Sequence, residues 1–271
     1  MTDLTEAHDE GRATGVLPGI LAGPSWLQDR LTDADLRIVD LRDLEGYSEA
    51  HIPGAVQLDL ARLGTSGDVG LENVLLSPGD FGRLMESLSI GTGDTVVAYD
   101  DQWGLAAARL VWALHFYGHP SAAVLDGGWD RWRDEGRPET DQVPQPRAAD
   151  FRSTLNADAG ADFAWLSERI SDPEVAFLDT RTQMEFEEGH LPDALSWDWF
   201  NAVPPGSWDC ARDPQELREE WEALGIGPTQ DVVVYCRSGM RAAHTYVVLK
   251  HAGYARVRLY DGSWQEWSVR V

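Results

Sequence analysis

The chain has 271 residues, a hydrophobic content of 43% and twelve tryptophans, which suits a folded protein with one large domain or two ordinary ones. Its formal net charge of −24 argues against nucleic acid or an anionic membrane surface as a partner. No apolar run approaches the length of a membrane span, and Met1 to Gly15 lacks the apolar core of a secretory signal. Two cysteines make no disulfide framework, so we expect a reducing, cytoplasmic setting.

A long stretch of the sequence occurs twice, in the same order. The copies begin at Asp40 and Asp179, 139 residues apart, and later motifs recur at offsets of 136 and 135 residues. The matched segments are Asp40–Arg42 with Asp179–Arg181, Tyr47–Ala55 with Phe186–Ala194, Val96–Asp100 with Val232–Cys236, and Leu125–Trp129 with Tyr260–Trp264. We therefore expect one domain present twice, at residues 16–140 and 161–271, with a linker at 141–160.

Each copy alternates short β-like runs with helical stretches. In the second copy, the expected strands are Val175–Leu178, Val232–Tyr235 and Val257–Tyr260, and the expected helices are Pro214–Leu224 and Arg241–His251. This alternation predicts an α/β fold in which each domain is a mainly parallel sheet flanked by helices. The connection, rich in Pro, Asp and Ala from Gly136 to Gly160, is long enough to wrap around one domain.

The two copies differ at the end of their central strand. The first copy has Asp100 there, and the loop that follows lacks arginine. A carboxylate cannot act as a sulfur nucleophile, so we interpret the first half as catalytically silent. Because pockets favour domain interfaces, we expect this half to support the second half and to form one wall of its cleft.

The second copy has Cys236 at the same place, followed by a short loop that ends at Arg241 and leads into a helix. A thiol between a strand end and a helix start lies near several unpaired backbone N–H groups. Those donors, together with the helix dipole, favour the thiolate and any anion bound beside it. Free cysteines often do nothing but pack, but two arginines and a glycine within five residues favour a reactive site.

Together these motifs resemble the rhodanese family, specifically its two-domain sulfurtransferases with an inactive first domain and an active second domain. The family's early signature, an aromatic residue followed by His-hydrophobic-Pro-Gly-Ala, is met by Tyr47–Ala55. It recurs from Phe186, with Asp193 in place of the glycine, and the late signature lies at Val257–Trp267. The resemblance extends from about residue 20 to the end and implies two tandem rhodanese-like domains.

The resemblance also implies a reaction. Cys236 would attack the outer sulfur of thiosulfate, release sulfite, and pass the sulfur from a persulfide to cyanide or a thiol by ping-pong kinetics. Arg237 resembles the residue found in thiosulfate-using members, whereas mercaptopyruvate-using members tend to have glycine there. The partners implied are a small anionic sulfur donor and a thiophilic acceptor, with no metal or cofactor.

Residues around the cysteine are expected to bind the donor. The substrate-binding residues implied are Arg181, Arg237, Ser238, Gly239, Met240 and Arg241. Arg181 has an alternative role as an ion-pair partner of Asp179 or Glu185, because the matching Arg42 is retained in the silent half.

Within the loop, each residue type suggests a role. Arg241 is expected first to anchor the loop through its carbonyls and second to add to the anion field. Gly239 is expected to supply a positive φ or a close backbone approach. Ser238 either donates a hydrogen bond to the sulfur or satisfies the turn, and the second role is the commoner one.

Three other functions stay open. A 3-mercaptopyruvate sulfurtransferase would share the whole framework. A cysteine phosphatase also holds an oxyanion above a thiolate, but its loop has five residues between cysteine and arginine. Cys236 and Arg241 are separated by four, and Ala242 stands where the arginine would be needed. A non-catalytic binding module would not need the intact cysteine loop.

Several conspicuous side chains are expected to be structural. His51 and His190 occur in both copies, including the copy without the cysteine, which indicates a scaffold role. The same reasoning assigns Trp129 and Trp264 to the core. Cys210 is interpreted as incidental, with a regulatory thiol as the alternative.

Overall fold

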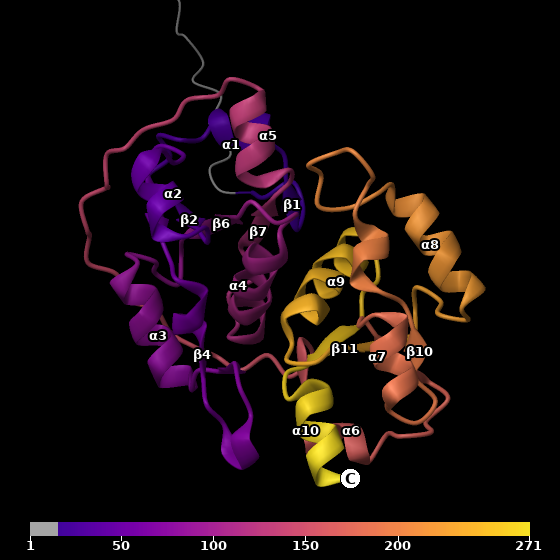
Figure 1. Cartoon of the computed structure of the whole chain (residues 1–271). Coiled ribbons are helices and arrows are strands. Elements are labelled where there is room, and N and C mark those ends of the chain that lie inside the picture. The colour runs from indigo at the N-terminus through magenta and orange to yellow at the C-terminus, as the bar shows by residue number, and fades with distance from the viewer. Residues whose placement is uncertain (1–15) are drawn as a thin grey trace, which may run out of the picture.

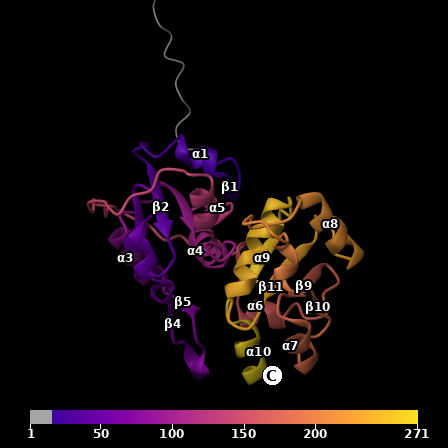
Figure 2. The same ribbon diagram turned by 45° about the horizontal axis from the view of Figure 1, so that its top comes forward.

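The computed structural model describes residues 16–271 and consists of two similar halves that lie side by side (Figure 1; Figure 2 gives a second direction). The expectation about a signal sequence in Met1–Gly15 lies outside the described residues. Within residues 16–271, no helix combines the length and the apolar character needed to cross a bilayer.

Each half contains a parallel five-stranded sheet, and the two sheets have the same strand order. The first sheet has the order β1-β7-β6-β2-β3 and the second β8-β12-β11-β9-β10. The strands of the first are β1 (Leu21–Ala22), β2 (Leu36–Asp40), β3 (Ala55–Gln57), β6 (Thr95–Tyr99) and β7 (Ala122–Leu125). Those of the second are β8 (Gly160–Ala161), β9 (Val175–Asp179), β10 (Leu195–Ser196), β11 (Asp231–Tyr235) and β12 (Val257–Tyr260). The predicted duplication and fold class are confirmed.

Helices flank both sheets, as expected for parallel strands whose apolar runs must be covered on both faces. In the first half they are α1 (Pro24–Gln28), α2 (Leu44–Glu49), α3 (Pro78–Ser87), α4 (Leu105–Phe116) and α5 (Gly128–Asp134). In the second they are α6 (Phe163–Ser167), α7 (Gln183–Glu188), α8 (Pro214–Ala223), α9 (Met240–His251) and α10 (Ser263–Arg270). Short 3-10 turns occur at Leu60–Leu63, Asp68–Gly70 and Trp199–Ala202. The five elements predicted for the second half are confirmed to within a residue at each end.

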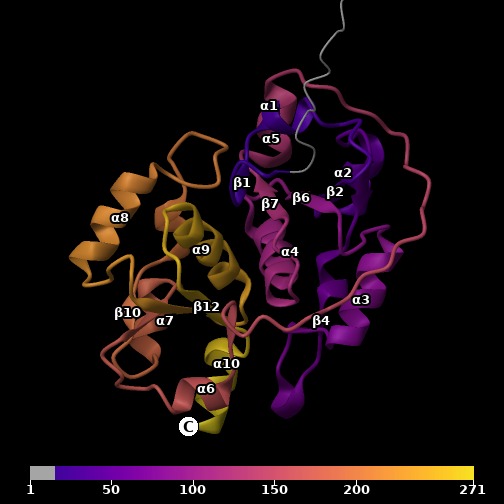
Figure 3. The ribbon, with the colours of Figure 1, turned by 180° about the vertical axis from the view of Figure 1, so that it is seen from behind.

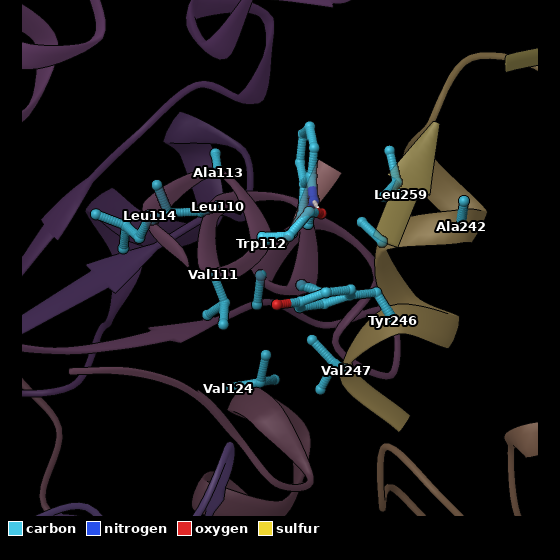
Figure 4. Packing of buried hydrophobic residues seen from close by; sticks show 14 of the residues in the cluster. Leu110, Val111, Trp112, Ala113, Leu114, Val124, Ala242, Tyr246, Val247 and Leu259 are labelled. Atoms are coloured by element: carbon cyan, nitrogen blue, oxygen red, sulfur yellow. Dashed lines mark hydrogen bonds between the residues drawn. The ribbon is translucent and has the colours of Figure 1, made fainter. Parts of the chain in front are cut away.

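The interface between the halves is formed by α4 and α9, which pack along each other. Figure 4 shows Val111 and Trp112 on one side facing Tyr246 and Val247 on the other. All four side chains are at most 2% exposed and belong to one apolar cluster that continues through both halves. Because Ala107–Leu114 and Ala242–Leu249 are buried without interruption, both helices lie in the interior rather than on the surface.

Two segments reach beyond their own sheets. The antiparallel hairpin of β4 (Gly64–Thr65) and β5 (Val74–Leu75) leaves the first half and contacts the second, where the Glu72 N–H donates to Gln265 Oε1 over 3.1 Å. The connection after α5 wraps around the outside of the first half before it enters β8 (Figure 3). It pairs with His51 through Thr140, and Phe151 is buried against α3. The domain boundaries at 140 and 160 stay a prediction.

Trp112 tests whether the halves share one core. It is fully buried on α4, and its indole N–H donates to the Ala159 carbonyl at the entry to the second sheet over 2.8 Å. Trp112→Ala should lower the free energy of unfolding by about 3–5 kcal/mol, because truncating a buried tryptophan leaves a cavity. Urea unfolding should remain a single transition, whereas Trp208→Ala, at a side chain 44% exposed, should cost less than about 1 kcal/mol. Two transitions, only one of them shifted by Trp112→Ala, would contradict a shared core.

Candidate active site

The loop of residues 236–241, called the cysteine loop below, connects β11 to α9. Its start is fixed by the first turn of α10: the Trp264 N–H donates to the Cys236 carbonyl over 2.9 Å and the Gln265 N–H to the Arg237 carbonyl over 3.1 Å. The Cys236 N–H donates in turn to the hydroxyl of Ser263, which is fully buried. The late signature of the sequence therefore anchors the loop that carries the nucleophile.

Backbone donors surround the sulfur of Cys236. Gly239, the N-cap of α9, has φ of +85°, and its N–H donates to Cys236 Sγ over 3.1 Å. The positive φ predicted for this glycine is confirmed. Within residues 16–271, the N–H groups of Arg237, Ser238 and Met240 have no hydrogen-bond partner. Unpaired N–H groups at a helix start attract negative charge.

The equivalent loop of the first half shows how such donors are used. The buried Asp100 carboxylate accepts four backbone N–H groups at 2.7–2.9 Å, those of Gln102, Gly104, Ala106 and Ala107. Burial raises the pKa of Asp100, and the four N–H donors oppose that rise. Gly104 is the left-handed residue here, four positions after Asp100, whereas Gly239 follows Cys236 by three. The first half thus fills its own anion site with a side chain, and the second half does not.

A cavity of about 540 Å³ lies over the cysteine loop, at the junction of the two halves. It is lined by Gly70, Leu71, Glu72, Arg181, Glu185, Glu188, Arg237, Ser238, Trp264, Gln265, Ser268 and Val269. The β4–β5 hairpin supplies the first three, so the expectation that the first half forms one wall is confirmed. Of the predicted site residues, Arg181, Arg237 and Ser238 line the cavity. Cys236, Gly239, Met240 and Arg241 do not, and Cys236 is only 1% exposed.

Arg181 is held by its own half of the molecule. Its Nη2 donates to Asp179 Oδ2 and to the Gly189 carbonyl, each over 2.6 Å, and its guanidinium lies 4.8 Å from the Trp264 ring centre. Arg42 makes the same contacts with Asp40, Ala50 and Trp129 in the silent half. The repeat indicates that the ion pair with Asp179 is structural. A contact from Arg181 to substrate stays a prediction.

Arg241 is anchored differently from what we expected. Both of its terminal nitrogens donate to Glu185, over 2.6 and 2.8 Å, rather than to the carbonyls of the loop. Glu185 is itself fixed because it forms the capping box of α7 with Thr182. Planar guanidinium and carboxylate groups match in such a two-point contact, which is why arginine favours it. Arg241 therefore fastens the end of the cysteine loop to α7, and it also interacts electrostatically with Cys236, in line with its second expected role.

Unlike Arg181 and Arg241, Arg237 is not paired with a carboxylate among the described residues. Its side chain is exposed at the cavity and makes no ion pair or hydrogen bond with any residue in 16–271. Ser238 also lines the cavity, and no hydrogen bond from its hydroxyl to the sulfur occurs within the same range. Of the two alternatives for Ser238, the structure therefore does not support donation to sulfur.

The histidines of the early signature are structural, as predicted. The rings of His51 and His190 stack on those of Tyr47 and Phe186 at centroid distances of 4.0 and 3.8 Å. The Nδ1 of each histidine also forms a hydrogen bond with the backbone carbonyl of the residue on which it stacks. Trp129 is buried as predicted. Trp264 packs against the core of the second half, as predicted, and it also lines the cavity.

Cys210 is buried beneath the loop of Asp100. Burial, together with nearby carboxylates, raises the pKa of its thiol well above the ordinary value. A thiol held protonated is a poor nucleophile, which agrees with the interpretation of Cys210 as incidental.

Some residues of the site have little signal in the sequence. The hairpin residues Gly70–Glu72 carry no motif and reach the site only through the fold. Glu185 was considered only as a partner of Arg181, although Thr182-x-x-Glu185 is a readable capping box. Arg109 of α4, which packs against Gly239 of the cysteine loop, was not predicted. It is the single charge inside the apolar helix Leu105–Phe116, which is a signal that could have been used.

The Arg241–Glu185 pair predicts a pH effect on stability. The guanidinium lowers the pKa of Glu185 to about 2 in the folded protein, so the pair stabilises the fold fully above the unfolded pKa of about 4.3 and loses that contribution as the pH falls toward 2. Because the pair is partly exposed, we expect about 1–2 kcal/mol. Glu185→Gln should therefore be less stable than wild type at pH 7 and show a flatter fall in stability below pH 5. Glu188→Gln, in the same cavity wall, is the control, and an equal change in both variants would refute the assignment.

Comparison with known proteins agrees with this geometry. The rhodanese-like domain profile matches residues 23–135 and 162–270. A sulfur carrier protein, TtuD of Thermus thermophilus, is 32% identical over 94% of this chain and 95% of its own length. A thiosulfate sulfurtransferase of Pseudomonas aeruginosa is 32% identical over 90% and 92%, and a probable 3-mercaptopyruvate sulfurtransferase of the same organism is 33% identical over 89% and 92%. The crystal structure of SseA from Escherichia coli, a 3-mercaptopyruvate sulfotransferase, superposes with a TM-score of 0.81 at 24% identity, over 91% of this chain and 99% of its own. The chain belongs to the rhodanese family and contains two rhodanese-like domains in tandem.

Proposed function

We propose that this protein is a thiosulfate sulfurtransferase in which Cys236 carries the transferred sulfur. The observation that carries the proposal is the hydrogen bond from the Gly239 N–H to Cys236 Sγ, in a loop with further unpaired N–H donors. A thiolate is the nucleophilic form of cysteine, and both the thiolate and a persulfide bear one negative charge. One set of donors therefore serves both forms of the enzyme.

The reaction balances without a cofactor. The Cys236 thiolate attacks the outer sulfur of thiosulfate, the S–S bond of thiosulfate breaks with its electron pair going to sulfite, and a persulfide anion remains. A thiophilic acceptor such as cyanide or a thiolate then attacks the outer sulfur of the persulfide and leaves with it, which regenerates the thiolate. Since the first product departs before the acceptor reacts, the kinetics should be ping-pong. The two buried, unpaired cysteines suit a reducing compartment, which we propose to be the cytoplasm.

The choice of donor rests on Arg237. Relatives of both donor classes are similar to this chain, so family membership does not select between them. Arg237 brings an uncompensated guanidinium to a cavity that also contains three glutamates, Glu72, Glu185 and Glu188. A small dianion such as thiosulfate needs such a local cation in a protein with a net charge of −24. 3-Mercaptopyruvate carries one negative charge and depends less on it.

The role of Cys236 is tested by the mass of the intact protein. After incubation with thiosulfate and removal of small molecules, wild type should gain the mass of one sulfur atom and lose it again on addition of cyanide. Cys236→Ser should gain nothing and should lose sulfur transfer, because a serine hydroxyl is not ionised by such a loop. Cys210→Ser is the matched control and should behave as wild type. Sulfur gain by Cys236→Ser would refute the assignment.

Replacement of Arg237 tests the donor. Arg237→Gly should lower kcat/KM for thiosulfate by roughly 10–100-fold but that for 3-mercaptopyruvate by less than about threefold, because a charge-assisted contact to an anion contributes about 1.5–3 kcal/mol. Arg237→Lys keeps the charge and should recover most of the thiosulfate activity. Steady-state kinetics with both donors makes the measurement. Equal losses with the two donors would show that Arg237 does not select thiosulfate.

A further inference from the structure

The active-site loop rests on a charged residue from the other half of the molecule. Arg109 lies on α4 in the silent half, and its side chain is only 2% exposed. Its Nη2 donates to Asp261 Oδ1 over 2.6 Å and to the Asn73 carbonyl over 2.9 Å. A buried guanidinium is expensive to desolvate and is normally fully paired. Here the other terminal nitrogen, Nη1, is buried without a partner within residues 16–271.

The unpaired nitrogen lies against the loop that holds the sulfur. A Cβ placed on Gly239 would come within 2.7 Å of Arg109 Nη1 and 3.3 Å of Asp261 Oδ1. The guanidinium therefore packs directly on the Gly239 backbone, whose N–H donates to Cys236 Sγ. This contact explains why position 239 excludes a side chain, in addition to its positive φ.

The duplicated half provides an internal comparison. Residues 105–116 of α4 correspond to residues 240–251 of α9, so Arg109 corresponds to His244. His244 lies beneath the silent loop, where Nε2 bonds the carbonyls of Trp103 and Cys210. Burial lowers the pKa of His244 to about 4, so it is neutral there. The loop with the nucleophile thus rests on a permanent cation, and the loop without it rests on a neutral ring.

The other arginines near the cysteine loop are held differently. Arg181 and Arg241 are each paired with a carboxylate of their own half, Asp179 and Glu185, and Arg241 also interacts electrostatically with Cys236. Asp261 is shared, because its Oδ2 also accepts the Leu75 N–H from the hairpin over 2.9 Å. Arg109 therefore keeps an N–H edge toward the loop while Asp261 fixes its position.

We propose that Arg109 is a positioning residue for sulfur transfer: it holds the Gly239 N–H toward Cys236 Sγ and favours negative charge on that sulfur. The silent half then contributes to the chemistry as well as to the cavity wall. This inference rests on the proposed function. The charge of Arg109 should favour the thiolate of Cys236, and the charge of Asp261 should oppose it. Asp261 compensates part of the charge, so its removal should strengthen the field at the loop.

The experiment measures how fast Cys236 reacts with iodoacetamide, an uncharged reagent, at neutral pH, with Cys236→Ser as background. Arg109→Met should slow alkylation by about tenfold, and Arg109→Lys should restore most of the rate, because the rate follows the thiolate fraction. Asp261→Asn should raise the rate above wild type. Arg131→Met, which removes the ion pair with Asp209 on the silent side, is the control and should leave the rate unchanged.

A structural ion pair gives a different pattern. If Arg109 and Asp261 only hold the halves together, Arg109→Met and Asp261→Asn should slow alkylation alike and Arg109→Lys should not restore it, which would overturn the proposal. If Arg109→Met does not fold, Asp261→Asn still decides: a rate above wild type supports the proposal, and a rate below wild type overturns it. Alkylation needs no sulfur donor, so a wild type that gains no sulfur from thiosulfate would refute the proposed function without changing this result.

Discussion

The site depends on one turn, in which a left-handed glycine of the cysteine loop caps the start of α9. Gly239 directs its own N–H at Cys236 Sγ, and the neighbouring N–H groups of Arg237, Ser238 and Met240 have no partner within residues 16–271. A helix start of this kind is an anion site before any substrate arrives. Backbone donors at such a position favour the thiolate, which is the nucleophilic form of cysteine.

The duplicated halves contain two versions of that turn, and a different residue occupies the position near the N–H donors in each. In the first, Asp100 satisfies four N–H donors, and the neutral His244 lies beneath the loop. In the second, a cysteine occupies a loop shorter by one residue, above the cation of Arg109. Each half also supports the other: the first-half hairpin forms one wall of the cavity, and the second half places Cys210 against Gly104 of the silent loop. The active half is therefore not independent of its partner.

Much of this could be predicted from the sequence because its signals are local or repeated. The alternation of apolar runs predicted five second-half elements to within a residue, and the position of Cys236 between strand and helix predicted the donors around it. Contacts that depend on the approach of distant segments had no such signal. Arg241 pairs with Glu185 on α7 instead of the loop carbonyls, Trp264 lines a cavity, and Arg109 approaches Gly239 only because α4 and α9 pack together. The proposed reaction comes from the family resemblance, and the structure adds the hydrogen bonds around Cys236 that would favour it.

A crystal structure of the protein treated with thiosulfate would test the central claim most directly. The account predicts extra electron density for one sulfur atom bonded to Cys236 Sγ, within hydrogen-bonding distance of the N–H groups of the cysteine loop and below Arg237. Density for the added sulfur on Cys210, or a Cys236 that stays unmodified while thiosulfate binds elsewhere, would contradict it.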